Sequence, residues 1–221
     1  MLIDSHNNAY GVEFIDKNSQ KIYLHAKKEV IISAGTIGSP KILMLSGIGD
    51  RKHLEHHGIG IKSHVPAVGK NLYDSLIATV LSEQRIKPPK EMVYSMGVMC
   101  FHSFRSEMEN SDEILQPDVQ FQQFVIEKWG QLSNMHCLGV FLSHPKSHGT
   151  IQLASNRYTD DPVIDYNYLD SKEDLNLMIK GVRKAQEIMS NYSYAGEIFD
   201  PVSSSDEDIE STIRNLSLIH I

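Results

Sequence analysis

The sequence has little of several features that mark whole classes of protein. Cysteine occurs only twice in 221 residues, at Cys100 and Cys137, so a scaffold stapled by several disulfides is excluded. We expect both cysteines to be small buried apolar residues. The longest mainly apolar stretch, Ile37 to Ile48, contains glycine, serine, proline and lysine and is much shorter than the roughly 20 residues of a membrane-spanning helix, so no membrane span is expected.

Positive charge is also scarce. Lysine and arginine number 21 against 28 aspartates and glutamates, which gives a formal net charge of −7, and no basic run is present. Binding to the phosphates of a nucleic acid or to an anionic membrane surface therefore has no electrostatic support. Hydrophobic residues make up 41% and charged residues 22%, which is typical of globular proteins and excludes a mainly disordered chain.

The beginning of the chain predicts strands. Residues 29–32 are a continuous strand core that leads into Ser-Ala-Gly, and this pattern predicts a strand buried on both faces of a central sheet. Before it, three short strand-like runs are separated by turn formers around Asn7 and Asn18, a pattern typical of a β-meander. These three runs are residues 2–4, 11–15 and 21–26.

Two short helices are predicted next. Ser39 is placed to cap the first helix, with Pro40 at the first helical position, where its missing N–H costs nothing, and Gly47 should end it. Asp50 should cap a second helix, with Gly58 at the left-handed position that follows.

The second half of the chain predicts an antiparallel sheet followed by two helices. Ser171 with Asp174 resembles a capping box before an apolar stripe, and Ser205 with Asp208 marks the start of another helix. The strand candidates are residues 96–101, 118–126, 138–142 and 150–153. The first helical stripe comprises Leu175, Met178, Ile179, Val182, Ala185, Ile188 and Met189, and the second helix carries Ile209 and Ile213.

Four segments point to one family. The first segment joins KEVIISAG to GTIGSPKILMLSGIG (residues 35–49) through their shared Gly35, and the other three, in chain order, are VPAVGKNLYD, HPKSHGTIQLAS and PVIDYNYL. In this order they resemble segments of the glucose–methanol–choline (GMC) FAD-dependent oxidoreductases, and residues 35–49 match the second signature of that family throughout. The resemblance covers nearly the whole chain and is closest to the insect branch, which includes glucose dehydrogenase-like and ecdysone oxidase-like proteins.

This resemblance implies a fold of class α/β plus α+β. Residues 1–75 would be the last part of an FAD-binding Rossmann-like domain, and residues 76–221 an incomplete substrate-binding domain with an antiparallel sheet and helices. It implies FAD as the cofactor and a small-molecule alcohol as the substrate, oxidised by hydride transfer to the flavin. Sugars, sterols and simple alcohols all fit, and either oxidase or dehydrogenase behaviour and any oligomeric state are compatible with it.

The resemblance also implies where the flavin would be contacted. Ala34 and Gly35 end the buried strand, and their small side chains would let the backbone come close to a bulky ligand. Asn71 and Leu72 would contact the flavin near its ring. The alternatives are that Gly35 only makes a tight turn into the helix and that Asn71 only closes a turn after Gly69.

Two parts of the family pattern are absent. No G-x-G-x-x-G turn precedes Gly35, although a Rossmann-type site needs those glycines to bind the pyrophosphate. The catalytic histidine of the family lies in an H-P-x-G-T segment, whereas this chain ends His220-Ile221, so His220 is only a poor candidate for the base that accepts the alcohol proton. We therefore expect an internal fragment that is inactive by itself, and a secreted parent protein is compatible with the sequence.

Other candidate sites have weaker signals. Clusters of histidine at 53, 56 and 57 and at 144 and 148 have no acidic or cysteine partner at recognisable spacing, so no metal site is expected. Phe121, Phe124 and Trp129 could line a substrate pocket or belong to the core. Asn191 and Asn215 begin glycosylation sequons, which matter only in a secreted protein. The alternative to the enzyme is a non-catalytic remnant or binding module that keeps the substrate-domain fold without flavin.

Overall fold

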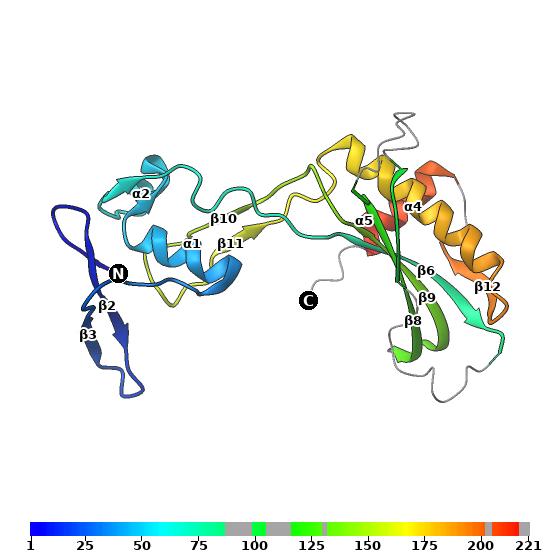
Figure 1. Cartoon of the computed structure of the whole chain (residues 1–221), viewed down its shortest axis with the longest axis horizontal. Helices are drawn as coiled ribbons and strands as arrows, with labels where there is room; N and C mark the ends of the chain where they lie inside the picture. The colour runs from blue at the N-terminus through cyan, green and yellow to red at the C-terminus, as the bar shows by residue number, and fades with distance from the viewer. Residues whose placement is uncertain (87–98, 105–115, 130–131, 202–204, 217–221) are drawn as a thin grey trace. The chain divides into compact units, whose positions relative to one another are not determined.

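The computed structural model describes residues 1–86, 99–104, 116–129, 132–201 and 205–216. The chain forms two compact units, shown in Figure 1. Unit 1 comprises Met1–Tyr73 and His148–Asn167, and unit 2 comprises Asp74–Ser147 and Tyr168–Ile221. The expected division between residues 75 and 76 lies two residues from the first crossing, but the segment His148–Asn167, which we had expected in the second domain, packs in unit 1.

Unit 1 begins with a three-stranded antiparallel sheet. The strands are β1 (Leu2–Ile3), β2 (Ala9–Ile15) and β3 (Lys21–His25), which pair in that order. The carboxylates of Asp4 and Asp16 each accept two backbone N–H groups at the two connecting turns, at distances of 2.8 Å. These local bonds explain why the turns form at these residues, and the predicted β-meander is confirmed.

The predicted central strand at residues 29–32 is wrong in this structure. The segment is extended but pairs with no strand among the described residues, and the side chain of Ile31 is 78% exposed. An apolar run becomes a strand only when a neighbouring strand supplies its hydrogen bonds. The segment therefore lies as an extended connection that leads into the first helix.

Helix α1 (Gly35–Leu45) begins earlier than predicted. Pro40 lies inside the helix, and the Ser39 hydroxyl accepts the backbone N–H of Ala34 at 3.1 Å. The hydroxyl thus satisfies one of the N–H groups at the helix start that have no intrahelical partner. The predicted end is confirmed, because Gly47 follows the C-cap residue with a φ of 86°.

The second helix has the predicted caps. In α2 (Arg51–His56) the Asp50 carboxylate accepts the His53 N–H at 3.0 Å, and Gly58 has a φ of 67°. The neighbouring strands β4 (Ile48–Gly49) and β5 (Ser63–His64) pair in parallel.

A hairpin from the second half of the chain completes unit 1. Strands β10 (Thr150–Gln152) and β11 (Val163–Asp165) pair with each other, so the predicted strand at residues 150–153 does not join the large sheet of unit 2. An isolated β-bridge between Leu72 and Gly149 joins the hairpin to the Met1–Tyr73 part of unit 1. The buried core that joins the hairpin to α1 and α2 comprises Met44, Leu54, Leu72, Ile151 and Leu153.

Unit 2 is built on a five-stranded antiparallel sheet with the order β12-β6-β9-β8-β7. The predicted antiparallel sheet is confirmed, although β6 and β12 had not been expected and residues 96–98 of one candidate lie outside the described residues. The strands are β6 (Ile77–Gln84), β7 (Met99–His102), β8 (Val119–Trp129), β9 (Leu132–Leu142) and β12 (Ala195–Asp200).

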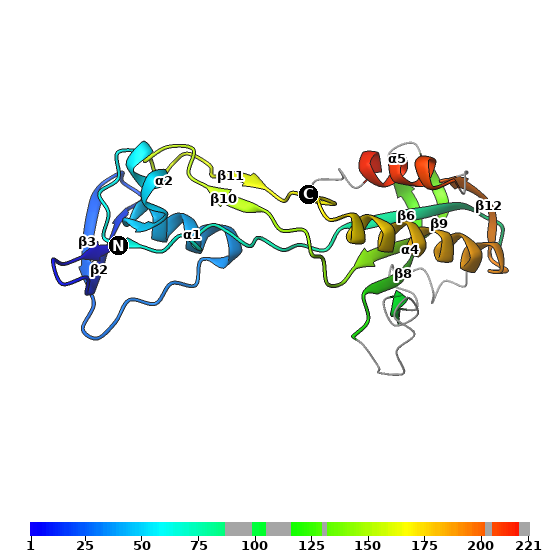
Figure 2. The ribbon, with the colours of Figure 1, turned by 90° about the horizontal axis from the view of Figure 1, so that it is seen from above.

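Two helices cover one face of this sheet, α4 (Lys172–Ser190) and α5 (Asp206–Leu216), as Figure 2 shows. The predicted stripe on α4 is confirmed at its centre, but Leu175 is only partly buried and Ile188 is exposed. Leu177, which we had not predicted, is fully buried. The buried face of α4 therefore differs from the predicted stripe. Close packing of the helix against the sheet explains this difference, because a Cβ at Gly181 would lie 2.5 Å from the side chain of Val140 on β9.

The two predicted capping boxes differ in outcome. The Ser205 hydroxyl accepts the backbone N–H of Asp208 at 3.2 Å, so the α5 box forms. Ser171 precedes α4 but makes no side-chain cap, because Asp174 has other partners. The buried Asp174 carboxylate accepts hydrogen bonds from the backbone N–H groups of Lys146 and Ser147, at 2.9 and 2.7 Å, and from the Ser147 hydroxyl, at 2.6 Å.

The cysteines also differ from each other. Cys137 is buried on β9, as predicted, and burial raises the pKa of its thiol to about 12. Cys100 is exposed, so that prediction is wrong: it lies on β7, the outermost strand of the sheet. Within the described residues, no helix combines the length and the apolar character that crossing a membrane requires.

Candidate functional site

The candidate cofactor residues all lie in unit 1. Ala34 and Gly35 are exposed at the start of α1, and a Cβ added to Gly35 would meet no other atom within 4 Å. A bulky ligand could therefore lie directly against this backbone. Two apolar side chains close by in sequence, those of Ile31 and Ile37, are exposed as well.

The backbone at Gly35 gives a second reason for a glycine. Its φ of 75° is in the left-handed region, where side chains with a Cβ are strained. The chain turns there from the extended segment into α1. Both alternatives for Gly35 are thus compatible with the geometry: the conformation explains the tight turn, and the open space leaves room for a ligand.

Asn71 and Leu72 occupy different environments. Asn71 is exposed and has a φ of 57°, a conformation that asparagine tolerates better than most residues. Leu72 is only 6% exposed, and its backbone N–H and C=O both bond to Gly149, at 3.1 and 2.8 Å. Leu72 is thus part of the core, and Asn71 presents its side chain at the surface.

One core brings the two candidate segments together. A Cβ on Gly69 would lie 3.5 Å from the end of the Met44 side chain and 2.2 Å from the carbonyl oxygen of Ile151. Since Met44 lies near the C-terminal end of α1, the Gly69–Leu72 segment packs against that end of the helix, and Gly35 begins the opposite end. Sequence reasoning did not single out Gly69 as a packing residue. Its signal is the glycine of the VGKNLYD segment.

A second contact joins two of the family-like segments within unit 2. The hydroxyl of Tyr168, in PVIDYNYL, donates to the carboxylate of Asp74, in VPAVGKNLYD, at 2.8 Å. The same carboxylate accepts the backbone N–H of Ser75 at 2.9 Å. These two bonds fix the orientation of the Asp74 carboxylate.

The candidate substrate-lining residues divide between the two faces of the sheet. Phe121 is 2% exposed and belongs to the core under the helices, so it does not line a pocket. Phe124 points to the opposite face, since alternate residues of a strand point in opposite directions. There it lies with Phe141 over Gly139, where a Cβ would be 3.0 Å from both rings. The side chain of Trp129 lies outside the described residues.

His220, the candidate base, lies outside the described residues. Within the described part of the chain, no group of three His, Cys, Asp or Glu side chains could hold a metal ion. His53, one of the clustered histidines, has a structural contact instead, because its Nε2 accepts the backbone N–H of Leu153 at 3.1 Å.

His53 makes the stability of unit 1 depend on pH. Burial, and next the charge of His57, lower the pKa of His53 below its usual 6.5. The unfolded chain therefore binds this proton first, so the stabilising contribution is present above about pH 6.5 and is lost as the pH falls further. We expect urea denaturation between about pH 7.5 and 5.5 to show a falling free energy of unfolding. His53→Gln should flatten this dependence and exposed His56→Gln should not; equal profiles for all three proteins would contradict the assignment.

Comparison with known proteins supplies the family. Two sequence models described as GMC oxidoreductase match residues 1–77 and 145–220, which together are well over half of the chain. An alcohol dehydrogenase [acceptor] from Pseudomonas putida is 30% identical over 94% of this chain and 43% of its own length. A choline oxidase from Arthrobacter globiformis is 29% identical over 97% of this chain and 41% of its own length.

Solved structures show the same fold. A formate oxidase from Aspergillus oryzae has a TM-score of 0.82 at 19% identity, covering 97% of this chain and 47% of that one. An FAD-dependent oxidoreductase from Chaetomium thermophilum has a TM-score of 0.75 at 21% identity, covering 94% and 47%. The chain spans less than half the length of these relatives. On the two matching domains, the chain belongs to the GMC oxidoreductase family.

Proposed function

We propose that the chain takes part in the oxidation of an alcohol group with FAD as the acceptor. Relatives named for alcohol, choline and pyranose oxidation support the substrate class. The formate oxidase and the Chaetomium enzyme are both described as proteins with FAD, which supports the cofactor. The observation that carries the proposal is the open backbone at Ala34 and Gly35, at the start of the helix whose other end packs in one core with Leu72.

Each residue has a distinct part in this proposal. Ala34 and Gly35 give the flavin close access to the start of α1, and the Asn71 amide offers both a donor and an acceptor to its polar groups. Leu72 positions Asn71 through its bonds to Gly149. Bound FAD supplies the chemistry by accepting a hydride from the alcohol carbon. A base near the flavin takes the hydroxyl proton, and His220 stays the candidate for that role.

The substrate would lie on the face of the unit 2 sheet that carries Phe124 and Phe141. Gln122 on this face is 7% exposed and its side-chain oxygen is 3.5 Å from the Gln120 amide nitrogen, so a polar pair lies among aromatic rings. Such a mixture suits a small alcohol with both apolar and hydroxyl groups. The finer assignment, to the insect glucose dehydrogenase-like branch with a sugar or sterol substrate, is supported by the sequence motifs alone.

The test uses the protein that includes this chain together with the pyrophosphate-binding glycine turn of the family. Purified protein should retain FAD through gel filtration, and its flavin absorbance should bleach on anaerobic mixing with a primary alcohol, choline or a pyranose. A colourless protein, or a flavin that no alcohol of the panel reduces, would favour the non-catalytic remnant instead.

We also expect no turnover from the 221-residue chain alone. Its sequence has no G-x-G-x-x-G turn to hold the pyrophosphate, so added FAD would not be bound in a fixed orientation. The assay follows reduction of an artificial electron acceptor with FAD and the same panel of alcohols. Turnover that disappears in His220→Ala would overturn this expectation and would establish His220 as the base.

A further inference from the structure

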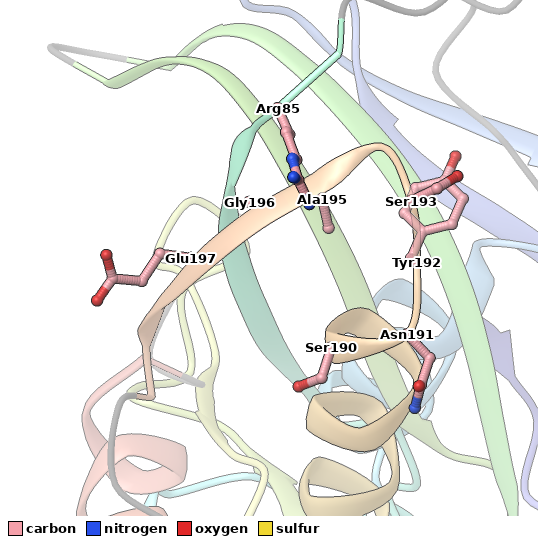
Figure 3. A pocket seen from close by; sticks show the side chains of 8 residues that line it. All are labelled: Arg85, Ser190, Asn191, Tyr192, Ser193, Ala195, Gly196 and Glu197. Atoms are coloured by element: carbon pink, nitrogen blue, oxygen red, sulfur yellow. The ribbon is translucent and has the colours of Figure 1, made fainter.

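Unit 2 has an open hollow of about 610 Å³ at one end of its sheet, shown in Figure 3. Its lining comes from Arg85 at the end of β6, from the C-terminal end of α4, and from the segment that leads into β12. Neither the cofactor candidates nor the proposed substrate face includes these residues.

The backbone of β12 creates this hollow. Ala195 pairs with Gln84 and Ile198 with Ser82, so two residues of β12 oppose the single residue Glu83. Such a β-bulge bends its strand locally. On the other side, the ring of Tyr192 packs edge-on against the buried ring of His136, with the centroids 5.4 Å apart, and this contact fixes the position of the segment.

The lining is polar and its charges balance. Among the described residues that line it, Arg85 is the one cation and Glu197 the one anion, and the other polar groups are the Ser190 and Ser193 hydroxyls, the Asn191 amide and the Tyr192 ring. A balanced set of donors and acceptors beside an aromatic ring suits a neutral polyhydroxyl compound such as a sugar better than an ion.

The same residues form a glycosylation sequon. Asn191, Tyr192 and Ser193 read N-x-S, and both Asn191 and Ser193 are exposed. From these observations we propose that Asn191 is an N-glycosylation site and that the first sugars of its glycan lie in the adjoining hollow. This proposal is independent of the oxidoreductase function.

The local geometry leaves the acceptor amide available. Asn191 is the C-cap of α4, and its Nδ2 donates one hydrogen bond to the carbonyl of Glu187 at 2.9 Å. In the transfer, Nδ2 forms a bond to C1 of a lipid-linked oligosaccharide, the bond from C1 to the lipid diphosphate breaks, and the amide loses one proton. The lipid diphosphate leaves. The second N–H stays on Nδ2, so the cap to Glu187 is kept.

The second sequon provides a control. Asn215 is the second-to-last residue of α5, and its amide is 3.4 Å from the Ser211 hydroxyl. The pocket residues do not include it. A variant at Asn215 therefore removes a sequon without changing the hollow.

The experiment expresses the protein that includes this chain through the secretory pathway of a eukaryotic host and analyses its peptides by mass spectrometry. The peptide with Asn191 should carry a glycan that Asn191→Gln and Ser193→Ala abolish and that Ser193→Thr and Asn215→Gln keep. An unmodified Asn191 in the secreted protein, or a glycan that survives in Ser193→Ala, would overturn the site.

A second measurement tests where the sugars lie. The sugar-free Ser193→Ala protein, which keeps the Asn191 amide, should melt at a lower temperature than the glycosylated protein, whereas trimming the glycan to its first sugar should not lower the melting temperature, because that sugar stays in the hollow. Arg85→Ala should reduce the difference between the two samples by removing a hydrogen-bond donor from the lining. Equal melting temperatures for the intact, trimmed and sugar-free proteins would show that the glycan does not occupy the hollow.

Discussion

Asp174→Asn should lower the free energy of unfolding of unit 2 by about 3 kcal/mol. The Asp174 carboxylate is fully buried and accepts hydrogen bonds from three donors, two backbone N–H groups and the Ser147 hydroxyl. An asparagine amide keeps one acceptor oxygen but places N–H groups opposite the donors on the other side. The hydroxyl of Ser147 also accepts the N–H of Ser171 at 3.0 Å, so the loss would spread to the start of α4.

Glu173→Gln is the matched control for this prediction. Glu173 is the neighbour of Asp174 on α4, loses the same charge in the variant, and forms an ion pair with Lys146 whose side chain is 59% exposed. Exposed pairs contribute little, so we expect a change below about 1 kcal/mol. Urea unfolding followed by circular dichroism compares the two. Similar losses in both variants would show that the buried bonds of Asp174 do not stabilise this unit.

Gly149→Ala should destabilise unit 1 by at least about 3 kcal/mol. A Cβ at this position would lie 1.9 Å from the carbonyl oxygen of Asp165 and 2.7 Å from the backbone of Tyr166, and neither can move without opening the β10-β11 pair. The displacement would also break the two backbone bonds between Gly149 and Leu72. The hairpin would then lose its hold on the Asn71 segment.

Gly60→Ala serves as the control, because a Cβ on Gly60 would meet no atom within 4 Å and its φ is not in the left-handed region. We expect this variant to be neutral or slightly stabilised, since alanine restricts the unfolded chain. Thermal unfolding of both variants measures the difference. A Gly149→Ala protein as stable as the Gly60→Ala protein would contradict the close packing of Gly149 against the backbone of Asp165 and Tyr166.

Local signals were sufficient for much of the fold. The turns at Asp4 and Asp16, the Asp50 cap of α2 and the Ser205 capping box of α5 all depend on residues at most four positions apart in sequence, and each formed where the sequence predicted it. Such bonds are made by neighbours in the chain, so a sequence pattern contains all of their partners.

Long-range partners explain what the sequence analysis missed. Ser171 and Asp174 have the pattern of a capping box, but Ser147, 27 residues before Asp174, binds the carboxylate instead. The hairpin at Thr150 packs with unit 1 because Leu72 bridges to Gly149 across the chain. The motifs located the candidate site by resemblance, but only the packing showed that Leu72 is buried while Asn71 is exposed.

The central claim is that the flavin lies against the backbone at Gly35. Gly35 and Gly58 form a matched pair, because both have a positive φ, 75° and 67°, and neither has an atom within 4 Å of an added Cβ. Valine at either position should impose a similar backbone strain. Only at Gly35 would it also fill the space that we assign to the cofactor.

The decisive measurement is therefore the ratio of bound flavin to protein in Gly35→Val and Gly58→Val, made in the FAD-loaded protein that includes this chain. We expect Gly58→Val to keep its flavin and Gly35→Val to lose at least about nine-tenths of it, which corresponds to a loss of about 1.4 kcal/mol or more in binding free energy. Equal flavin content in the two variants would contradict the placement of the flavin against Gly35, and would show that Gly35 serves only the turn into α1.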